Sequence, residues 1–254
     1  MSAVPTDRSE ATRRFRDEYR ATQIPAGYRG GGHLLFTFGG GAVALLACLL
    51  QLEQVRPLEW LTVPLAFLYA NLAEYFGHRF PMHRPFSGLG LVYRRHAGQH
   101  HRFFNDYTMA YDTRRDLRAV LFPPLLVIFF FGGFGLPAWL LLKWTLSANV
   151  AWLFIATGLA YFLNYEILHT AYHVPDGHWL GRVPGVERLK WLHQAHHDTR
   201  RMTRINFNIS YPICDWLFGT LDRNRHAPSD AASVEPTGAA AASDPLPHRT
   251  APTP

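Results

Sequence analysis

The sequence has little charge and almost no cysteine. Asp, Glu, Lys and Arg make up 17% of its 254 residues, below the ~25% of an ordinary soluble domain. The two cysteines, Cys48 and Cys214, exclude a disulfide scaffold and a cysteine-rich zinc fold. No apolar segment follows directly on Met1, so we expect no signal peptide in the usual position. At 48% hydrophobic and 14% aromatic, the chain is too apolar for a disordered protein.

Long stretches without charge predict an integral membrane protein. Residues 33–52 are apolar and, at ~1.5 Å per residue, long enough to cross a ~30 Å hydrocarbon core. A second apolar segment covers 60–77, and two more, 119–132 and 137–167, are expected to meet at a turn in the sequence FGGFGLP. We therefore predict four spans. The alternative, a soluble protein with buried helices, is disfavoured because several runs of about 20 apolar residues are rare outside membranes.

The basic residues predict the orientation of the spans. The formal net charge is +6, and of 25 Lys and Arg residues only Arg56 and Lys143 fall near the two links on the far side. The positive-inside rule therefore places both termini in the cytoplasm. Because the arginines flank apolar spans, anionic lipid headgroups are a simpler partner for them than nucleic acid. The excess of arginine over lysine and the Ala/Pro tracts indicate a bacterial inner membrane.

Composition divides the chain into three parts. Residues 1–32 form a polar, arginine-rich segment that we expect in the cytosol. Residues 33–222 contain the spans and are the expected catalytic domain. Residues 223–254 are rich in Ala, Pro, Ser and Thr and are expected to be a disordered tail. Glu74 lies near the end of the second span and is expected to face the bundle interior.

Histidine is the residue type that carries the functional signal. Ten of the 14 histidines fall into four clusters, each just beyond a span or near its end. The clusters are His78 and His83; His96, His100 and His101; His169 and His173; and His193, His196 and His197. The remaining four, His33, His178, His226 and His248, receive no assigned role.

Spacing predicts which rings lie together. Residues three or four apart share one face of a helix, so His169 and His173 should point the same way, as should the three histidines of the last cluster. By the same rule His96 and His100 share a face, with His101 turned aside. His78 and His83 are five apart with Pro81 between them, so this pair should straddle a helix end where the chain bends.

The clusters together predict a dinuclear metal centre at the membrane surface. Ten neutral imidazoles are too many for one ion, whereas two ions with about four to six ligands each would use them. Imidazole suits Zn, Cu, Fe and Ni, and open coordination positions suit oxygen chemistry. All four clusters lie on the predicted cytoplasmic side. A lipid chain could reach such a centre from the membrane, and a soluble electron donor from the cytosol.

The same motifs resemble the fatty acid hydroxylase / sterol desaturase superfamily. The resemblance covers about residues 74–221 and depends on EYFGHRFPMHR, HAGQHH, YEILHTAYH, LKWLHQAHHD and INFNISYPICDWLFGTL. It implies an all-α fold: an integral membrane four-helix bundle with a cytosolic helical cap, and two metal ions held by the ten clustered histidines. The implied metal is iron, and zinc can occupy such sites. The second cluster departs from membrane fatty acid 2-hydroxylases, which have two residues between its first two histidines where this chain has three.

The resemblance implies an enzyme that hydroxylates a C–H bond of a lipid with dioxygen. No cytochrome-type domain is fused to the chain, so a separate ferredoxin- or cytochrome-type donor would supply electrons. A desaturase, or a sterol- or carotenoid-modifying oxidase, remains open. A metal transporter and a bis-histidine haem protein are disfavoured, because their ligands should lie in the middle of the spans. The sequence does not identify the substrate, the donor or the oligomeric state.

Two carboxylates are candidate catalytic residues. Glu166 lies one turn before His169, and Asp198 adjoins His197. Metal-binding histidines usually donate their second N–H to such groups, so we expect Glu166 to accept an imidazole N–H. The alternative is that both residues are ordinary polar groups of caps, surface or interface. Asp106, Asn206 and Asn208 are further candidates for the same role.

Overall fold

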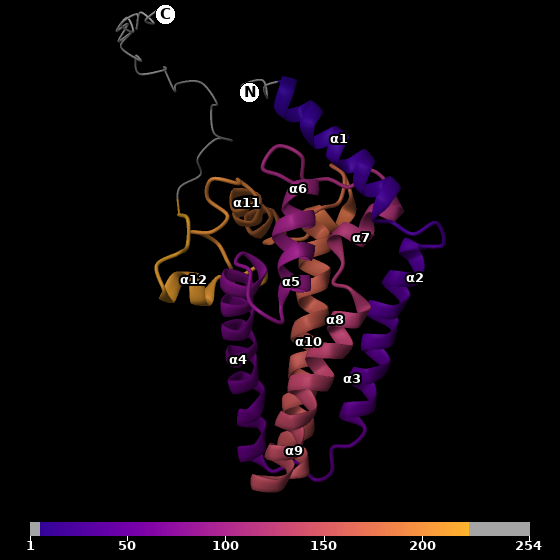
Figure 1. The fold of residues 1–254 in the computed structure, drawn as a ribbon. Coiled ribbons are helices and arrows are strands. Elements are labelled where there is room, and N and C mark those ends of the chain that lie inside the picture. The colour runs from indigo at the N-terminus through magenta and orange to yellow at the C-terminus, as the bar shows by residue number, and fades with distance from the viewer. Residues whose placement is uncertain (1–5, 224–254) are drawn as a thin grey trace, which may run out of the picture.

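The computed structural model describes residues 6–223, and these residues form helices and no strand (Figure 1). The all-α prediction is confirmed for this part of the chain. The tail predicted from residue 223 onward lies, apart from its first residue, outside the described residues, as do His226 and His248.

The first predicted span is one continuous helical stretch, Gly30–Leu49. It consists of α2 (Gly30–Leu34), the π-helical η1 (Leu35–Gly40) and α3 (Gly41–Leu49). Gly41 permits a close approach to α10 (Ala148–Tyr172), since a Cβ at this position would lie 2.5 Å from a methyl carbon of Leu163. Inside a membrane the hydrophobic effect does not drive helices together, and small residues such as glycine allow the close packing that does.

The second predicted span corresponds to η2 (Pro57–Leu61) and α4 (Thr62–Gly77). Pro57 stands in the first turn of η2, where its missing N–H has no helical partner to lose. α4 packs along α10. Near its end, the Glu74 carboxylate accepts hydrogen bonds from the backbone N–H groups of Ile209 and Ser210 and from the Tyr161 hydroxyl. Glu74 therefore faces inward, as the sequence predicted.

The turn predicted in FGGFGLP is wrong. α8 (Pro124–Phe130), the π-helical η6 (Phe131–Gly135) and α9 (Leu136–Thr145) follow one another without a break, and the chain reverses at residues 146–147. Pro137 follows directly on the π-helical turn η6, and local π adjustments of this kind accommodate a proline within a membrane helix. The Ser147 hydroxyl then starts α10 by accepting a hydrogen bond from the backbone N–H of Val150.

Three helical stretches are long and apolar enough to cross a membrane: Gly30–Leu49, Arg114–Thr145 and Ala148–Tyr172. The 16-residue α4 is not one of the three. Large apolar side chains on these stretches face outward, among them Leu35, Leu125, Leu140 and Trp144, which is 88% exposed. So much exposed apolar surface fits a protein embedded in lipid.

The shorter helices gather around one end of α4 and α10 (Figure 1). At this end Tyr19 and Ile24 pack with Phe103, Phe104 and neighbouring apolar side chains. The elements concerned are α1 (Thr6–Thr22), η3 (His78–Met82), α5 (Gly90–Arg95), η4 (His96–His100), α6 (His101–Phe103), η5 (Arg114–Asp116), α7 (Leu117–Val120), η7 (Trp179–Arg182), α11 (Val186–His196) and α12 (Ile213–Leu217).

Candidate metal centre

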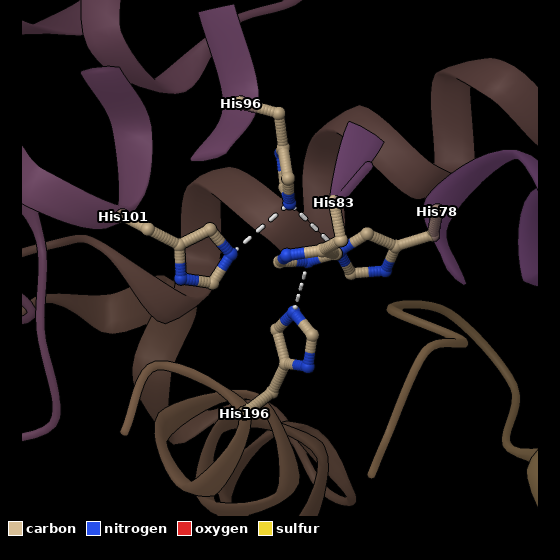
Figure 2. A group of neighbouring side chains, drawn as sticks. All are labelled: His78, His83, His96, His101 and His196. Atoms are coloured by element: carbon tan, nitrogen blue, oxygen red, sulfur yellow. Dashed lines mark hydrogen bonds between the residues drawn. The ribbon is translucent and has the colours of Figure 1, made fainter. Parts of the chain in front are cut away.

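All ten clustered histidines meet in two adjoining groups at this end of the molecule. The first histidine group has its potential ligand atoms within 4.8 Å of one another (Figure 2) and comprises His78, His83, His96, His101 and His196. The second histidine group is built around His100, His169, His173 and His193. His197 completes it, because its Nε2 lies 3.2 Å from Nε2 of His100 and 3.0 Å from Nε2 of His193.

Two π-helical turns decide which rings join the first group. η3 lies between His78 and His83, and η4 between His96 and His101, so each pair spans five residues. In η4 the backbone N–H of His101 bonds to the carbonyl of His96 instead of the residue four earlier. The extra residue in the turn brings His101 beside His96 and directs His100 into the second group. The prediction that His101 is turned aside is therefore wrong. The rings of His96 and His100, predicted to share one face, do stack with their centres 5.3 Å apart, but they belong to different groups.

The remaining histidines come from α10 and α11. His169 and His173, four residues apart at the end of α10, both lie in the second group, in agreement with the sequence. α11 contributes to both groups, with His196 in the first and His193 in the second. His193 and His197 lie together in the second group, as predicted, whereas His196 joins the first group, so the prediction that all three rings lie together is wrong for His196.

Every one of the ten rings directs its Nε2 atom into its group. In the first group Nε2 of His78 lies 2.8 Å from Nε2 of His96, and Nε2 of His83 lies 3.0 Å from Nε2 of His196. His101 joins through a 3.0 Å contact to His96. In the second group the corresponding Nε2 distances are 3.3 Å between His169 and His100 and 3.1 Å between His173 and His193.

The opposite nitrogen of five rings is held by a backbone carbonyl. The pairs are His78 with Phe207, His196 with Ile205, His100 with Ala119, His173 with Met109 and His197 with Phe104. A carbonyl oxygen only accepts, so in each of these rings Nδ1 carries the proton. Burial lowers the pKa of His78 and of His100 to about 4, so both rings are neutral at physiological pH. Each therefore presents an unprotonated Nε2 to its group.

The second group contains a contact that calls for a cation. The Nδ1 atoms of both His100 and His197 donate to carbonyls, at 2.8 Å each. Their Nε2 atoms then face each other as bare lone pairs 3.2 Å apart, and no hydrogen bond can form between them. Two buried lone pairs at this distance repel unless a positive ion lies against both. The donor set thus fits metal binding through Nε2.

The two predicted catalytic carboxylates do not contact the rings in the expected way. Oε1 of the fully buried Glu166 accepts the backbone N–H of Phe122 at 3.0 Å. Among residues 6–223 its Oε2 has no hydrogen-bond partner, and neither does Nδ1 of His169. Asp198 accepts hydrogen bonds from the backbone and guanidinium of Arg200, at 3.0 and 3.2 Å. Burial raises the pKa of Asp198, but the Arg200 hydrogen bonds outweigh it and the net pKa is lowered.

Two rings of the first group are held by backbone carbonyls of one loop, and the sequence pattern, which pointed to side-chain acceptors, did not predict this loop. Residues 205–208 carry the Ile205 and Phe207 carbonyls, and the buried Asp215 fixes this loop. Its carboxylate accepts the N–H groups of Phe207 at 2.9 Å and Asn208 at 2.7 Å, and the Thr220 hydroxyl at 2.6 Å. The only available signal was the DWLFGTL ending, which contains Asp215.

The other candidates also contact groups other than the rings. The Asn206 amide donates to the Leu192 carbonyl at 2.9 Å, and the Asn208 amide donates to the Asn71 carbonyl at 3.0 Å. Asp106 lies 3.8 Å from Arg8. His33 and His178 stand apart from both groups. His33 lies against Phe122, and His178 caps η7.

A small cavity adjoins both histidine groups. It has a volume of about 40 Å³ and is bordered by His96, His100 and His169. Its other walls are mainly apolar and include Phe122, just before α8, Leu126 in α8 and Tyr165 in α10. The cavity therefore connects the imidazoles with the apolar helices.

Comparison with known families agrees with this arrangement. A family model described as fatty acid hydroxylase matches residues 63–220, more than half of the chain. This range contains all ten clustered histidines. Neither the curated proteins nor the solved structures contain a match.

Proposed function

The chain belongs to the fatty acid hydroxylase family, and from this we propose that it is a membrane oxygenase that hydroxylates a C–H bond of a fatty acyl or related lipid chain. The proposal also assigns the ten clustered histidines to two metal ions, one in each group. The observation that carries it is the pair of unprotonated Nε2 atoms of His100 and His197, 3.2 Å apart in a buried site. Neutral imidazoles with open positions suit iron, and zinc binds the same ligands.

Two iron ions, when bound, would supply activation of dioxygen. The protein's part is to hold the rings, shape the cavity and keep water out. The rings are almost fully buried, with His173, His196 and His197 at 0% exposure. Carbonyls of three different segments, residues 104–109, residue 119 and residues 205–207, fix five of the rings before any ion arrives, which favours a defined coordination geometry.

The cavity supports a lipid substrate. Its apolar walls, Phe122, Leu126 and Tyr165, lie between the imidazoles and the apolar helices α8 and α10. A hydrocarbon chain could enter from the bundle and place one carbon beside His96, His100 and His169. In this proposal Glu166 is a positioning residue, because it holds Phe122, which lines the cavity. For Asp198 the proposal is a positioning role as well, because its carboxylate closes the turn after His197 by accepting the backbone N–H of Arg200.

We place the histidine end and both chain termini in the cytoplasm. The support is the distribution of Lys and Arg, because within residues 6–223 only Arg56 and Lys143 lie towards the opposite end. A ferredoxin- or cytochrome-type donor would then reach the centre from the cytosol. The composition fits a bacterial inner membrane, with no nucleic acid as partner.

A desaturase of the same family is the second candidate, because the same ligands serve both reactions. A metal transporter fits less well. Within residues 6–223 the groups of potential ligands are the two histidine groups, and both lie at one end of the long helices.

The test is lipid analysis of cells that do or do not express the chain, grown under isotopically labelled dioxygen. Hydroxylation predicts a lipid that carries one labelled oxygen atom, whereas desaturation predicts one that lacks two hydrogens. His197→Ala should remove the product, and the control His178→Ala should retain it, since His178 lies outside both groups. An unchanged lipid profile on expression of the wild-type chain would contradict the proposal.

A further inference from the structure

The N-terminal helix α1 reaches the second histidine group through one buried arginine. α1 lies outside residues 63–220, which the family comparison matches, and it packs across α6 (Figure 1). Arg13 and Arg14 of this helix are exposed. The Arg16 side chain is only 6% exposed and lies against residues 103–112.

The Arg16 guanidinium binds three backbone carbonyls of one loop. Its Nε donates to Phe103 at 2.8 Å, and Nη2 donates to Thr108 at 3.1 Å and to Ala110 at 3.0 Å. The guanidinium carbon also lies 5.3 Å from the centre of the Phe104 ring. Arginine presents five N–H donors in a rigid planar fork, so two of its nitrogens can hold carbonyls at separate points, whereas the three donors of lysine share a single nitrogen.

Carbonyls next to these three orient two rings of the second group. The Phe104 carbonyl accepts Nδ1–H of His197 at 2.8 Å, and the Met109 carbonyl accepts Nδ1–H of His173 at 2.7 Å. Phe104 is extended, with φ −116° and ψ 132°. Successive peptide groups of an extended chain point to opposite sides. The carbonyls that Arg16 binds therefore determine where the neighbouring carbonyls point.

A second residue of α1 holds the same loop. Thr12 lies one turn before Arg16, and its hydroxyl accepts a hydrogen bond from the Asn105 amide at 2.9 Å. The Thr12 hydroxyl also lies 2.8 Å from the Tyr107 hydroxyl. Thr12 and Arg16, on one face of α1, thus hydrogen-bond to residues 103–110 from one side, while the histidines contact these residues from the other.

We propose that Arg16 is a positioning residue for the ion of the second histidine group. It holds residues 103–110 so that the Phe104 and Met109 carbonyls fix His197 and His173 with Nε2 unprotonated. This inference rests on the proposed metal centre. The carbonyls that orient His78 and His196 in the first group come from a different loop, at Phe207 and Ile205. The effect of Arg16 is therefore confined to one of the two ions.

The test is the metal content of the full-length protein, purified in detergent and dialysed against a weak chelator. Arg16→Lys keeps the charge but loses the planar fork, so the second ion should bind ~10–100-fold more weakly, as is typical when the partner of a ligating histidine is lost. We expect two ions in the wild type and one in Arg16→Lys. The matched control is Arg13→Lys on the exposed face of α1, where Arg13 pairs only loosely with Asp17 at 3.7 Å. This variant should keep two ions.

Double variants identify which ion is lost. His173→Gln removes a ligand of the second group and His78→Gln a ligand of the first. Arg16→Lys combined with His173→Gln should still hold one ion, whereas Arg16→Lys combined with His78→Gln should hold none. The reverse pattern, or two tightly held ions in Arg16→Lys, would overturn the proposal.

A milder variant covers the case in which Arg16→Lys does not fold. Thr12→Val removes a hydroxyl contact to the same loop and should speed the loss of one ion to the chelator. Release of both ions at the wild-type rate would count against a role for α1. The readout is metal content, so it separates this inference from the proposed reaction. A wild-type chain that holds two ions but forms no oxidised lipid would sink the hydroxylase assignment alone.

Discussion

Replacement of Asp215 should remove one metal ion and leave the other. Asp215 is fully buried, and its carboxylate accepts three hydrogen bonds, from Phe207, Asn208 and Thr220. In Asp215→Asn one oxygen becomes an NH₂ group that must face the N–H of Asn208 or of Phe207. An unsatisfied buried donor costs roughly 1–3 kcal/mol, and the two remaining bonds to a neutral acceptor are each weaker by about 1 kcal/mol. The sum, about 3–5 kcal/mol, is below the stability of most domains, so the variant should fold.

The lost bonds loosen the loop whose Phe207 and Ile205 carbonyls orient His78 and His196. Both rings belong to the first histidine group, so metal content after chelator dialysis should fall from two ions to one. Combination with His173→Gln should then leave none. The control is Asp176→Asn, because Asp176 is fully exposed and pairs with Lys190 only at 3.7 Å. Full retention of both ions by folded Asp215→Asn would refute the idea that these carbonyls set the ring orientation.

Three further predictions concern orientation, Glu166 and pH. Reporter fusions at Gly30 and after Asp222 should both report the cytoplasm and a fusion near Pro57 the opposite side, and termini on opposite sides would contradict the proposed topology. Glu166→Gln should keep both ions, because the glutamine oxygen can still accept the Phe122 N–H. Glu166→Leu leaves this buried N–H without an acceptor, so it should lower the turnover and reduce the free energy of unfolding by about 1–3 kcal/mol. Loss of an ion in Glu166→Gln would instead indicate that the Glu166 carboxylate accepts an imidazole N–H directly. The metal-free protein should lose thermal stability as pH falls from about 6.5 towards 4. In this range the histidines of the unfolded chain bind protons, whereas His78 and His100, with pKa values of about 4, stay neutral in the folded protein. A melting temperature that stays constant over this range would argue against neutral buried rings.

The sequence was sufficient to predict the composition of the centre but not its division. Four clusters at the ends of apolar segments identified all ten rings that the structure brings together. Helical spacing then failed at η4 and α11. A π-helical turn places His101 beside His96, and its only trace in the sequence is a spacing of five, which also occurs between His78 and His83. α11 contributes His193 to one group and His196 to the other, and this division depends on tertiary packing.

The turn between the last two long helices was missed for a local reason. Gly and Pro in FGGFGLP are turn signals in soluble proteins, but here the glycines lie in a π-helical segment and Pro137 follows directly on it within one continuous helical stretch. The turn before α10 lies at Ser147, an N-cap residue whose signal is weak because it stands alone between Leu146 and Ala148 in the sequence. The supports of the rings were invisible for another reason. They are backbone carbonyls, which every residue carries, and only the fold shows that those of Phe104, Met109 and Phe207 point at histidines.

Elemental analysis shows whether the two histidine groups hold two metal ions. The protein is purified in detergent from cells grown with iron, and the metal is expressed per chain. We expect two ions per chain, chiefly iron, and a variant carrying both His100→Gln and His197→Gln should retain only the ion of the first group. With fewer than one tightly bound ion per chain in the folded wild-type protein, the histidine groups would not be a dinuclear centre.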